Sequence, residues 1–390
     1  MSHKADVFDG WIRSEFVHLN TELEEQYFAQ DDRANCAGVG EPLKQQLLDA
    51  GRAHITDLLH EGNTDEGFER GFDLLGNVGL YMAACGRHGL TQTAGESRSP
   101  LYEASALAMQ LGASLGVTPR FATSHLTTHN RAMNGRYKSF TRLPDEYLFT
   151  EYNTRAVLAY KRAADALLRI LPLGVSHPVT GDLLRAAAGA LSDVVEYNRC
   201  LFEQLDTDRF FYCVRPYFKP HRVGLHVYRG ANAGDFAGIN VIDLLLGLCS
   251  AQHAYYSQQL VDKFLYMMPE DQATLRDCMR RRSLMDEFLE HCAQRRSEPW
   301  YQTNLALFLQ VCDRHGATAA QHHDQLVKKF IERPAEGLND RYQENLTASG
   351  PPLPVLLRSL EKLRDLRMAA DRGDIPSRHA DLQRLRASLG

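Results

Sequence analysis

Apolar side chains recur at steps of three and four residues along most of the chain, which is the spacing of one face of an α-helix. The first such stripe consists of Phe8, Ile12, Phe16, Leu19, Leu23 and Tyr27. No stretch keeps up the alternation of apolar and polar residues that would support a sheet. Further helices are predicted over residues 42–59, 67–85, 101–115, 146–170, 182–205, 241–267, 269–295, 301–333 and 354–372. The pattern therefore predicts an all-α protein.

Two segments rich in proline and glycine interrupt the helical pattern, at residues 172–181 and 216–238. The first suits a domain hinge. The second is long for a connection in a compact helical protein, and such loops more often carry function than not.

Composition and charge narrow the class of protein. The 390 residues are 44% apolar and 24% charged, as in an ordinary globular chain. Lys and Arg number 44 against 49 Asp and Glu, without a charged block, which argues against nucleic acid or anionic lipid as a partner. The start has no apolar run that would form a secretory signal, and no window has the apolar length to cross a bilayer. We expect a cytoplasmic protein.

Eight cysteines are scattered along the sequence without a CxxC pair. This spacing argues against a zinc site and against covalent haem attachment. We interpret the cysteines as buried thiols in a reducing cytoplasm.

The helix predicted at 301–333 holds the strongest chemical signal. Its apolar stripe contains Leu305, Leu309, Cys312, Gly316, Ala319, His323, Leu326 and Phe330. His323 should therefore be buried. His322 lies on the same side of the helix as His315 and Thr318, and this side should be exposed to solvent. The small residues near His323 would let a flat cofactor approach it. The alternative is a core histidine that a backbone carbonyl satisfies.

Phe210, Phe211 and Arg215 form a second signal, because a cation follows an aromatic pair shortly before the glycine-rich loop. An arginine among aromatic rings suits a carboxylate attached to a ring, since the guanidinium donates two parallel hydrogen bonds and the rings stack. This pattern is typical of a site for an aromatic amino acid. The alternative is a surface arginine beside a core aromatic pair.

Two weaker signals come from the loop at 230–235 and from His125 and His129. The loop is built from small residues whose backbone could come close to a ligand, but it lacks the Lys-Ser/Thr pair of a phosphate loop. The two histidines would lie one helical turn apart if their segment were helical. The segment between them lacks the glutamate of a zinc protease and contains Thr127 and Thr128, which disfavour a helix, so a metal pair is not expected.

Taken together, several blocks in the same order resemble the histidine-ligated haem superfamily of indoleamine 2,3-dioxygenase, and more closely its monodechloroaminopyrrolnitrin synthase branch. These blocks are the aromatic pair with Arg215, the following residues up to 224, the loop at 230–234, residues 243–247 and residues 323–330.

The resemblance implies an all-α, indoleamine 2,3-dioxygenase-like bundle, in which a smaller N-terminal region (1–145) covers the distal side of a larger haem-binding region (146–390). It implies haem b held without a covalent bond, with O2 as co-substrate and His323 as the iron ligand. The cofactor would also contact Asn232, Ala233, Gly234, Asp243 and Ala319.

For the substrate, the resemblance implies that Arg215 binds the carboxylate of tryptophan or a related indole while Phe210 and Phe211 pack on its ring. Thr127 and Ser349 would also contact the substrate. His125 and His129 would come near the distal pocket, either as structural residues or as a general acid that promotes O–O cleavage.

The chain departs from the dioxygenase at two places. Ala320 stands where the dioxygenase has an arginine that contacts a haem propionate, and Thr347-Ala348-Ser349-Gly350 replaces its mobile Gly-Thr-Gly-Gly loop. Other hypotheses are a haem-binding sensor or carrier, a peroxidase-like hydroxylase, and a haem-free helical interaction protein. An oxygenase would need an electron donor that keeps iron ferrous, and a homodimer is compatible with the amphipathic helices.

Overall fold

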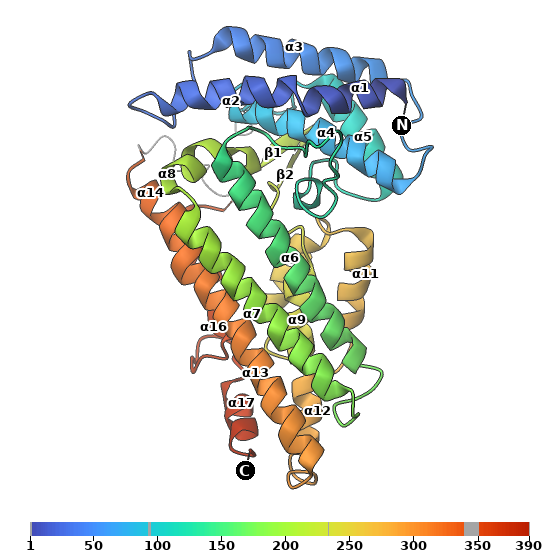
Figure 1. Cartoon of the computed structure of the whole chain (residues 1–390), viewed down its shortest axis with the longest axis vertical. Helices are drawn as coiled ribbons and strands as arrows, with labels where there is room; N and C mark the ends of the chain where they lie inside the picture. Colours follow the sequence, from blue (N-terminus) through green and yellow to red (C-terminus); the bar gives the residue numbers. More distant parts are fainter. Residues whose placement is uncertain (1, 93–94, 233, 339–350, 390) are drawn as a thin grey trace. The chain divides into compact units, whose positions relative to one another are not determined.

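The computed structural model describes residues 2–92, 95–232, 234–338 and 351–389. Its helices confirm the predicted all-α class (Figure 1). The chain divides into two compact units that are discontinuous in sequence. Unit 1 comprises Met1–Glu151, Leu205–Asp235 and Phe330–Leu353, and unit 2 comprises Tyr152–Gln204, Phe236–Lys329 and Pro354–Gly390. The expected boundary between residues 145 and 146 stays a prediction.

The N-terminal part of unit 1 is a group of packed helices: α1 (His3–Ile12), α2 (Glu15–Phe28), α3 (Glu41–Leu58), α4 (Phe68–Arg87) and α5 (Tyr102–Leu115) (Figure 1). The stripe that predicted a single first helix is divided between α1 and α2. The break falls at Ser14, whose φ of −129° lies outside the helical range and whose hydroxyl donates to the Gly10 carbonyl at 2.6 Å. Because both helices bury the same apolar stripe, the periodicity could not reveal the break.

The rest of unit 1 is made of short elements. They are the 3₁₀ turn η1 (Thr123–His125), α8 (Thr207–Arg209), the π-helix η2 (Phe210–Val214), the 3₁₀ helix η3 (Arg215–Phe218), the strands β1 (His221–Val223) and β2 (His226–Tyr228), and α14 (Arg333–Glu336). In the described parts of the chain, β1 and β2 are the only named strands, and they pair antiparallel around Gly224, whose φ is 58°. Most of the breaker-rich segment 216–238 is therefore a small hairpin and loop.

Unit 2 is built of helices that are 8 to 25 residues long. They are α7 (Thr180–Gln204), α9 (Gly238–Leu246), α10 (Ala254–Phe264), α11 (Pro269–Cys278), α12 (Leu284–His291), α13 (Pro299–Gln321), α16 (Leu353–Arg367) and α17 (His379–Arg386). Helix α6 (Pro144–Ile170) contributes to both units, as does the π-helix η4 (His322–Glu332). Helix α17 was not predicted.

Two helices of unit 2 that the periodicity predicted as continuous are broken. The helix expected at 241–267 stops at the end of α9. There, Gly247 adopts the left-handed conformation with a φ of 77° and ends the helix. The helix expected at 269–295 is interrupted before α12, where the Ser283 hydroxyl caps the new helix by accepting from the Asp286 amide.

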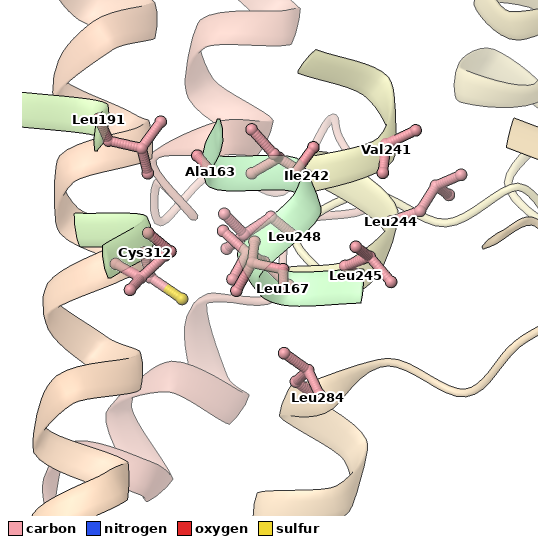
Figure 2. Packing of buried hydrophobic residues seen from close by; sticks show 14 of the residues in the cluster. Ala163, Leu167, Leu191, Val241, Ile242, Leu244, Leu245, Leu248, Leu284 and Cys312 are labelled. Carbon is pink, nitrogen blue, oxygen red and sulfur yellow. The ribbon is translucent and has the colours of Figure 1, made fainter. Parts of the chain in front are cut away.

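The core of unit 2 is a continuous apolar cluster (Figure 2). It brings Leu167 of α6, Leu191 of α7, Ile242 of α9 and Cys312 of α13 together, and each is at most 3% exposed. Removing such side chains from water is the main driving force for packing α13 along α7.

Two expectations about the whole chain can be compared with the structure. Within its described parts, no helix combines the length and apolar character needed to cross a membrane. The cysteines are free thiols, of which Cys36, Cys200 and Cys292 are only partly buried. The interpretation as buried thiols therefore holds for the other five.

Candidate functional site

The two neighbouring histidines after α13 lie where the helix changes from α to π geometry. Helix α13 passes into η4 at His322, and π-helical segments are frequent at functional sites. His323 is 7% exposed and His322 is open to solvent, which confirms the prediction from the stripe. Burial lowers the pKa of His323, so its imidazole is neutral near pH 7. A neutral imidazole is the form that binds a metal.

The hydrogen bonding of His323 separates the two interpretations of its ring. Among the described residues, the buried Nδ1 atom has no hydrogen-bond partner. Its Nε2 atom lies 4.0 Å from the Asp324 carboxylate, which is too far for a hydrogen bond. The structure therefore does not show a core histidine satisfied by a backbone carbonyl. A buried ring nitrogen without a partner fits a residue that meets a group absent from the protein chain.

The small residues on the same helix do not all have the expected role. A Cβ atom on Gly316 would lie 3.3 Å from the Arg367 carbonyl oxygen and 3.3 Å from the Met368 Cα. Gly316 therefore admits the backbone that follows α16, and the expectation that it makes room for a cofactor was wrong. Ala319 is buried, at 8% exposure.

Asp243 lies at the centre of a buried polar network in unit 2. Its carboxylate accepts from His315 Nε2 at 2.7 Å, from the Tyr256 hydroxyl at 2.7 Å, and from Arg367 Nε and Nη2, both at 2.9 Å. Burial alone would raise the pKa of Asp243, but the Arg367 charge and the His315 hydrogen bond outweigh it and hold this pKa below its ordinary value. The carboxylate is ionised and fully hydrogen-bonded.

This network corrects one expectation about α13. His315 and Thr318 were expected on the solvent-exposed side of the helix, but they are 0% and 1% exposed. Polar residues at helical spacing face either water or a buried polar partner, and the sequence pattern does not distinguish the two.

Arg215 and the aromatic pair lie together in unit 1. The Arg215 guanidinium carbon is 5.3 Å from the centroid of the Phe211 ring, and Arg215 is 9% exposed. The alternative of a surface arginine is therefore wrong. Burial lowers the pKa of Arg215 to about 10, which still leaves the side chain protonated near pH 7. Phe210 faces other rings, with centroids 5.0 Å from Phe149 and 5.8 Å from Phe330.

The small-residue loop is held against the segment that starts at Arg120. The Thr123 hydroxyl donates to the Asn232 side chain at 2.7 Å and accepts from the Asn232 amide at 2.7 Å. Asp235 pairs with Arg120 and accepts from the Thr123 amide at 2.7 Å. Gly234 has a φ of 127°, a conformation that only glycine adopts readily. The structure thus brings together two of the segments expected near the distal pocket.

His125 is fully engaged by the backbone. Its Nδ1 accepts from the Ala122 amide at 2.8 Å, and its Nε2 donates to the Phe72 carbonyl at 2.8 Å. Burial, followed by the charge of Lys138, lowers the pKa of His125 to about 3. A neutral ring with both nitrogens engaged cannot donate a proton to a ligand, so the structure supports the structural alternative for His125.

The other predicted site residues are less informative. His129 is half-buried, with Nδ1 3.1 Å from the Thr128 hydroxyl, and Thr127 donates to the Thr123 carbonyl at 2.9 Å. No group of three or more metal-ligating side chains exists among the described residues. Ala233 and Ser349 lie outside those residues.

Several polar residues that the structure brings into these regions were not predicted as site residues. They are Arg120, Lys219, His221, His315 and Arg367. His315 could have been suspected from its place one row from the stripe of α13. The others carry no sequence signal, because nothing in their local pattern distinguishes a buried cation or imidazole from an exposed one.

Comparison with known proteins adds one finding. A model of the family described as monodechloroaminopyrrolnitrin synthase PrnB matches residues 2–389, which is nearly the whole chain. No curated protein matches the sequence.

Proposed function

Since the chain belongs to the monodechloroaminopyrrolnitrin synthase PrnB family, a branch of the indoleamine 2,3-dioxygenase-like superfamily of haem-dependent oxygenases, we propose that it is an oxidoreductase that binds haem b and acts with O2 on tryptophan or a tryptophan-derived indole. The observation that carries this proposal concerns His323 at the start of a π-helix: among the described residues, its buried Nδ1 atom has no hydrogen-bond partner.

The described residues fit the cofactor at this histidine. A buried neutral imidazole without a hydrogen-bond partner at Nδ1 has a lone pair or an N–H to offer, and an iron ligand is held through one ring nitrogen while the other keeps a proton. We assign His323 as the ligand. Bound haem would supply an iron atom at which O2 is activated once the iron is ferrous.

Asp243 and Ala319 belong to unit 2, as His323 does, and we propose that they act at a distance from the iron. Asp243 keeps one buried negative charge on α9 of the same unit, where Arg367 balances it. Ala319 leaves a small side chain one turn before the ligand. Neither role needs a direct contact with the imidazole.

In unit 1, we assign Arg215 to the substrate carboxylate and Phe211 to its aromatic ring. The guanidinium is buried and protonated near pH 7, so it can donate two parallel hydrogen bonds to a carboxylate. Its position over the Phe211 ring limits the directions in which its donors point. Binding by this pair would fix the direction in which the indole ring lies.

The remaining predicted contacts rest on the resemblance alone. Phe210, Thr127, His129, Ser349 and the loop at 230–234 stay predictions for substrate or cofactor binding. An electron donor and a homodimer are predictions of the same kind. We do not assign His125 a part in proton transfer, because the backbone uses both of its ring nitrogens.

The absorbance spectrum of the chain purified from haem-supplemented cells tests the proposal. We expect a Soret band that is lost or strongly changed in His323→Ala and retained in the matched control His322→Ala, because His322 is the adjacent, solvent-exposed histidine. Loss of the band in His322→Ala alone would mean that the wrong histidine was assigned. Absence of the band from the unmodified chain would favour a haem-free interaction protein.

Arg215→Ala separates the enzyme from a haem sensor or carrier. If the chain is an oxygenase for an indole amino acid, tryptophan should perturb the haem spectrum of the unmodified protein, and the variant should need at least about tenfold more tryptophan for the same change. A carrier should show the same spectrum with and without tryptophan in both proteins.

A further inference from the structure

Helix α5 of unit 1 has apolar side chains on two of its faces. One face is turned to the core, where Leu107 is buried and the helix packs on α4 and α3. The other face is exposed, and its residues follow one another at steps of four, three and four, which is the spacing of one side of a helix. These residues are Tyr102, Ala106, Met109 and Ala113.

The exposure of this second face is substantial. Tyr102 is 57% exposed and Met109 is 43% exposed. A helix with one buried face usually turns charged or polar side chains to the solvent, so a second apolar stripe is the pattern of a surface that another surface covers. We call Tyr102, Ala106, Met109 and Ala113 the α5 face.

The turn of the β1–β2 hairpin adjoins the α5 face. The Ser99 amide, just before α5, donates to the Gly224 carbonyl at 2.9 Å. A Cβ atom on Gly224 would lie 3.2 Å from the Met109 Sδ atom. The turn is therefore held close to the helix, and its next residue, Leu225, is 63% exposed. The exposed apolar surface thus continues from α5 to the hairpin.

The α5 face has no charge to offer a partner. From residue 104 to residue 115 the sequence contains no charged residue, and the exposed positions beside the stripe are Gln110 and Ser114. Glu103 is the one charged residue of α5, and its carboxylate lies 3.6 Å from Arg52 Nε. A basic or acidic partner would lose hydration on this face without gaining an opposite charge. An uncharged apolar surface suits it better, and a second copy of α5 is such a surface.

The α5 face is also complementary in shape to itself. In an antiparallel pair of helices related by a two-fold axis, residues at equal distances on either side of the axis lie at the same height. With the axis halfway along the stripe, Tyr102 of one copy meets Ala113 of the other, and Ala106 meets Met109. Each contact pairs a large side chain with a small one, which is the arrangement that lets two helices interdigitate.

We propose that the α5 face is the interface of a homodimer, in which α5 of one chain packs antiparallel on α5 of a second copy, with the hairpin turn at its rim. One helix and one turn from each chain make a small interface, below about 1,200 Å² in total, as in weak and transient complexes. The dimer should therefore have a Kd of about 1–100 µM. This inference goes beyond the proposed function and does not depend on haem.

Sedimentation velocity of the full chain over about 1–300 µM measures the association. We expect the unmodified chain to pass from monomer to dimer in this range. Met109→Glu should weaken the dimer by at least about 30-fold, because the new carboxylate would be buried without a partner and would lie near its own symmetry copy. The matched control Met133→Glu changes a methionine of the same unit that is 42% exposed, and it should dimerise like the unmodified chain.

A mixture of two variants tests the antiparallel register. Ala106→Lys alone should be monomeric, for the same reason as Met109→Glu alone. When the two variants are mixed, a heterodimer should form, because the register places the new lysine of one chain opposite the new glutamate of the other and keeps one unmodified contact between Ala106 and Met109. Both substituted positions are exposed, so the melting temperatures should stay close to that of the unmodified chain.

The other outcomes would overturn the interface. A chain that remains monomeric over the whole range, a dimer that Met109→Glu leaves intact, and an equal loss of the dimer in Met133→Glu each contradict it. A mixture that stays monomeric contradicts the register and with it the proposed pairing. Flotation of a monomeric chain with vesicles of uncharged phosphatidylcholine, lost in Met109→Glu, would assign the α5 face to a membrane surface instead.

Discussion

The buried network around Asp243 makes the stability of unit 2 depend on a single carboxylate. Asp243→Asn keeps the shape of the side chain but removes the charge that balances Arg367, whose side chain is 14% exposed. The amide nitrogen of the new residue would also face a donor. Breaking a buried ion pair by removing one partner typically costs about 3–5 kcal/mol. We expect a loss of this size in the free energy of unfolding.

Chemical denaturation of the full chain, followed by far-ultraviolet circular dichroism, measures this loss. A matched control is Asp313→Asn, which breaks an ion pair with Arg386 in which the side chains are 57% and 42% exposed. An exposed pair contributes at most about 1 kcal/mol, so the control should be nearly neutral. At roughly 2–4 °C for each kcal/mol, Asp243→Asn should lower the melting temperature by roughly 10 °C.

The double variant Asp243→Asn with Arg367→Met tests the cause of the loss. If the unpaired guanidinium is the main cost, replacing it with an apolar side chain should recover more than half of the lost free energy. The difference between the unmodified chain and Asp243→Asn should also stay constant from about pH 5 to 8. The pKa of Asp243 is lowered, so its contribution is present above the ordinary aspartate pKa and is lost only as the pH falls through the lower, folded-state pKa. An Asp243→Asn loss no larger than that of Asp313→Asn would refute the reasoning.

Three further predictions concern unit 1. The pKa of His125 is about 3, so its neutral form stabilises the fold above the unfolded-state value near pH 6.5. That stability should fall by up to about 1.4 kcal/mol per pH unit as the pH drops from about 6 to 4, and His125→Phe should flatten this slope in denaturation curves. Gly79→Ala should destabilise the chain by about 1–3 kcal/mol, because the new Cβ would lie 2.2 Å from a backbone nitrogen, whereas Gly10→Ala, with nothing within 4 Å, should stabilise it. Arg120→Met should leave Asp235 with only its hydrogen bonds from Thr123 and should speed proteolysis of the loop at 230–235. Unchanged cleavage would show that the ion pair does not hold this loop.

The period of the apolar residues was enough to predict the all-α class and most of the long helices, because burial of one helical face repeats every 3.6 residues whatever the helix packs against. The same reasoning predicted that His323 is buried and His322 exposed, since neighbouring helical residues point about 100° apart. The breaks at Ser14 and Gly247 were not visible, because a stripe can continue across a kink or a turn.

The tertiary structure decided which polar residues meet. Asp243, Tyr256, His315 and Arg367 come from four helices, and only their packing shows that the carboxylate pairs with His315 and Arg367. The local sequence pattern shows which face of its own helix or strand a residue occupies. Ion pairing, burial of charge and unsatisfied hydrogen bonds depend instead on segments that are distant in the chain. These are the properties that define a site.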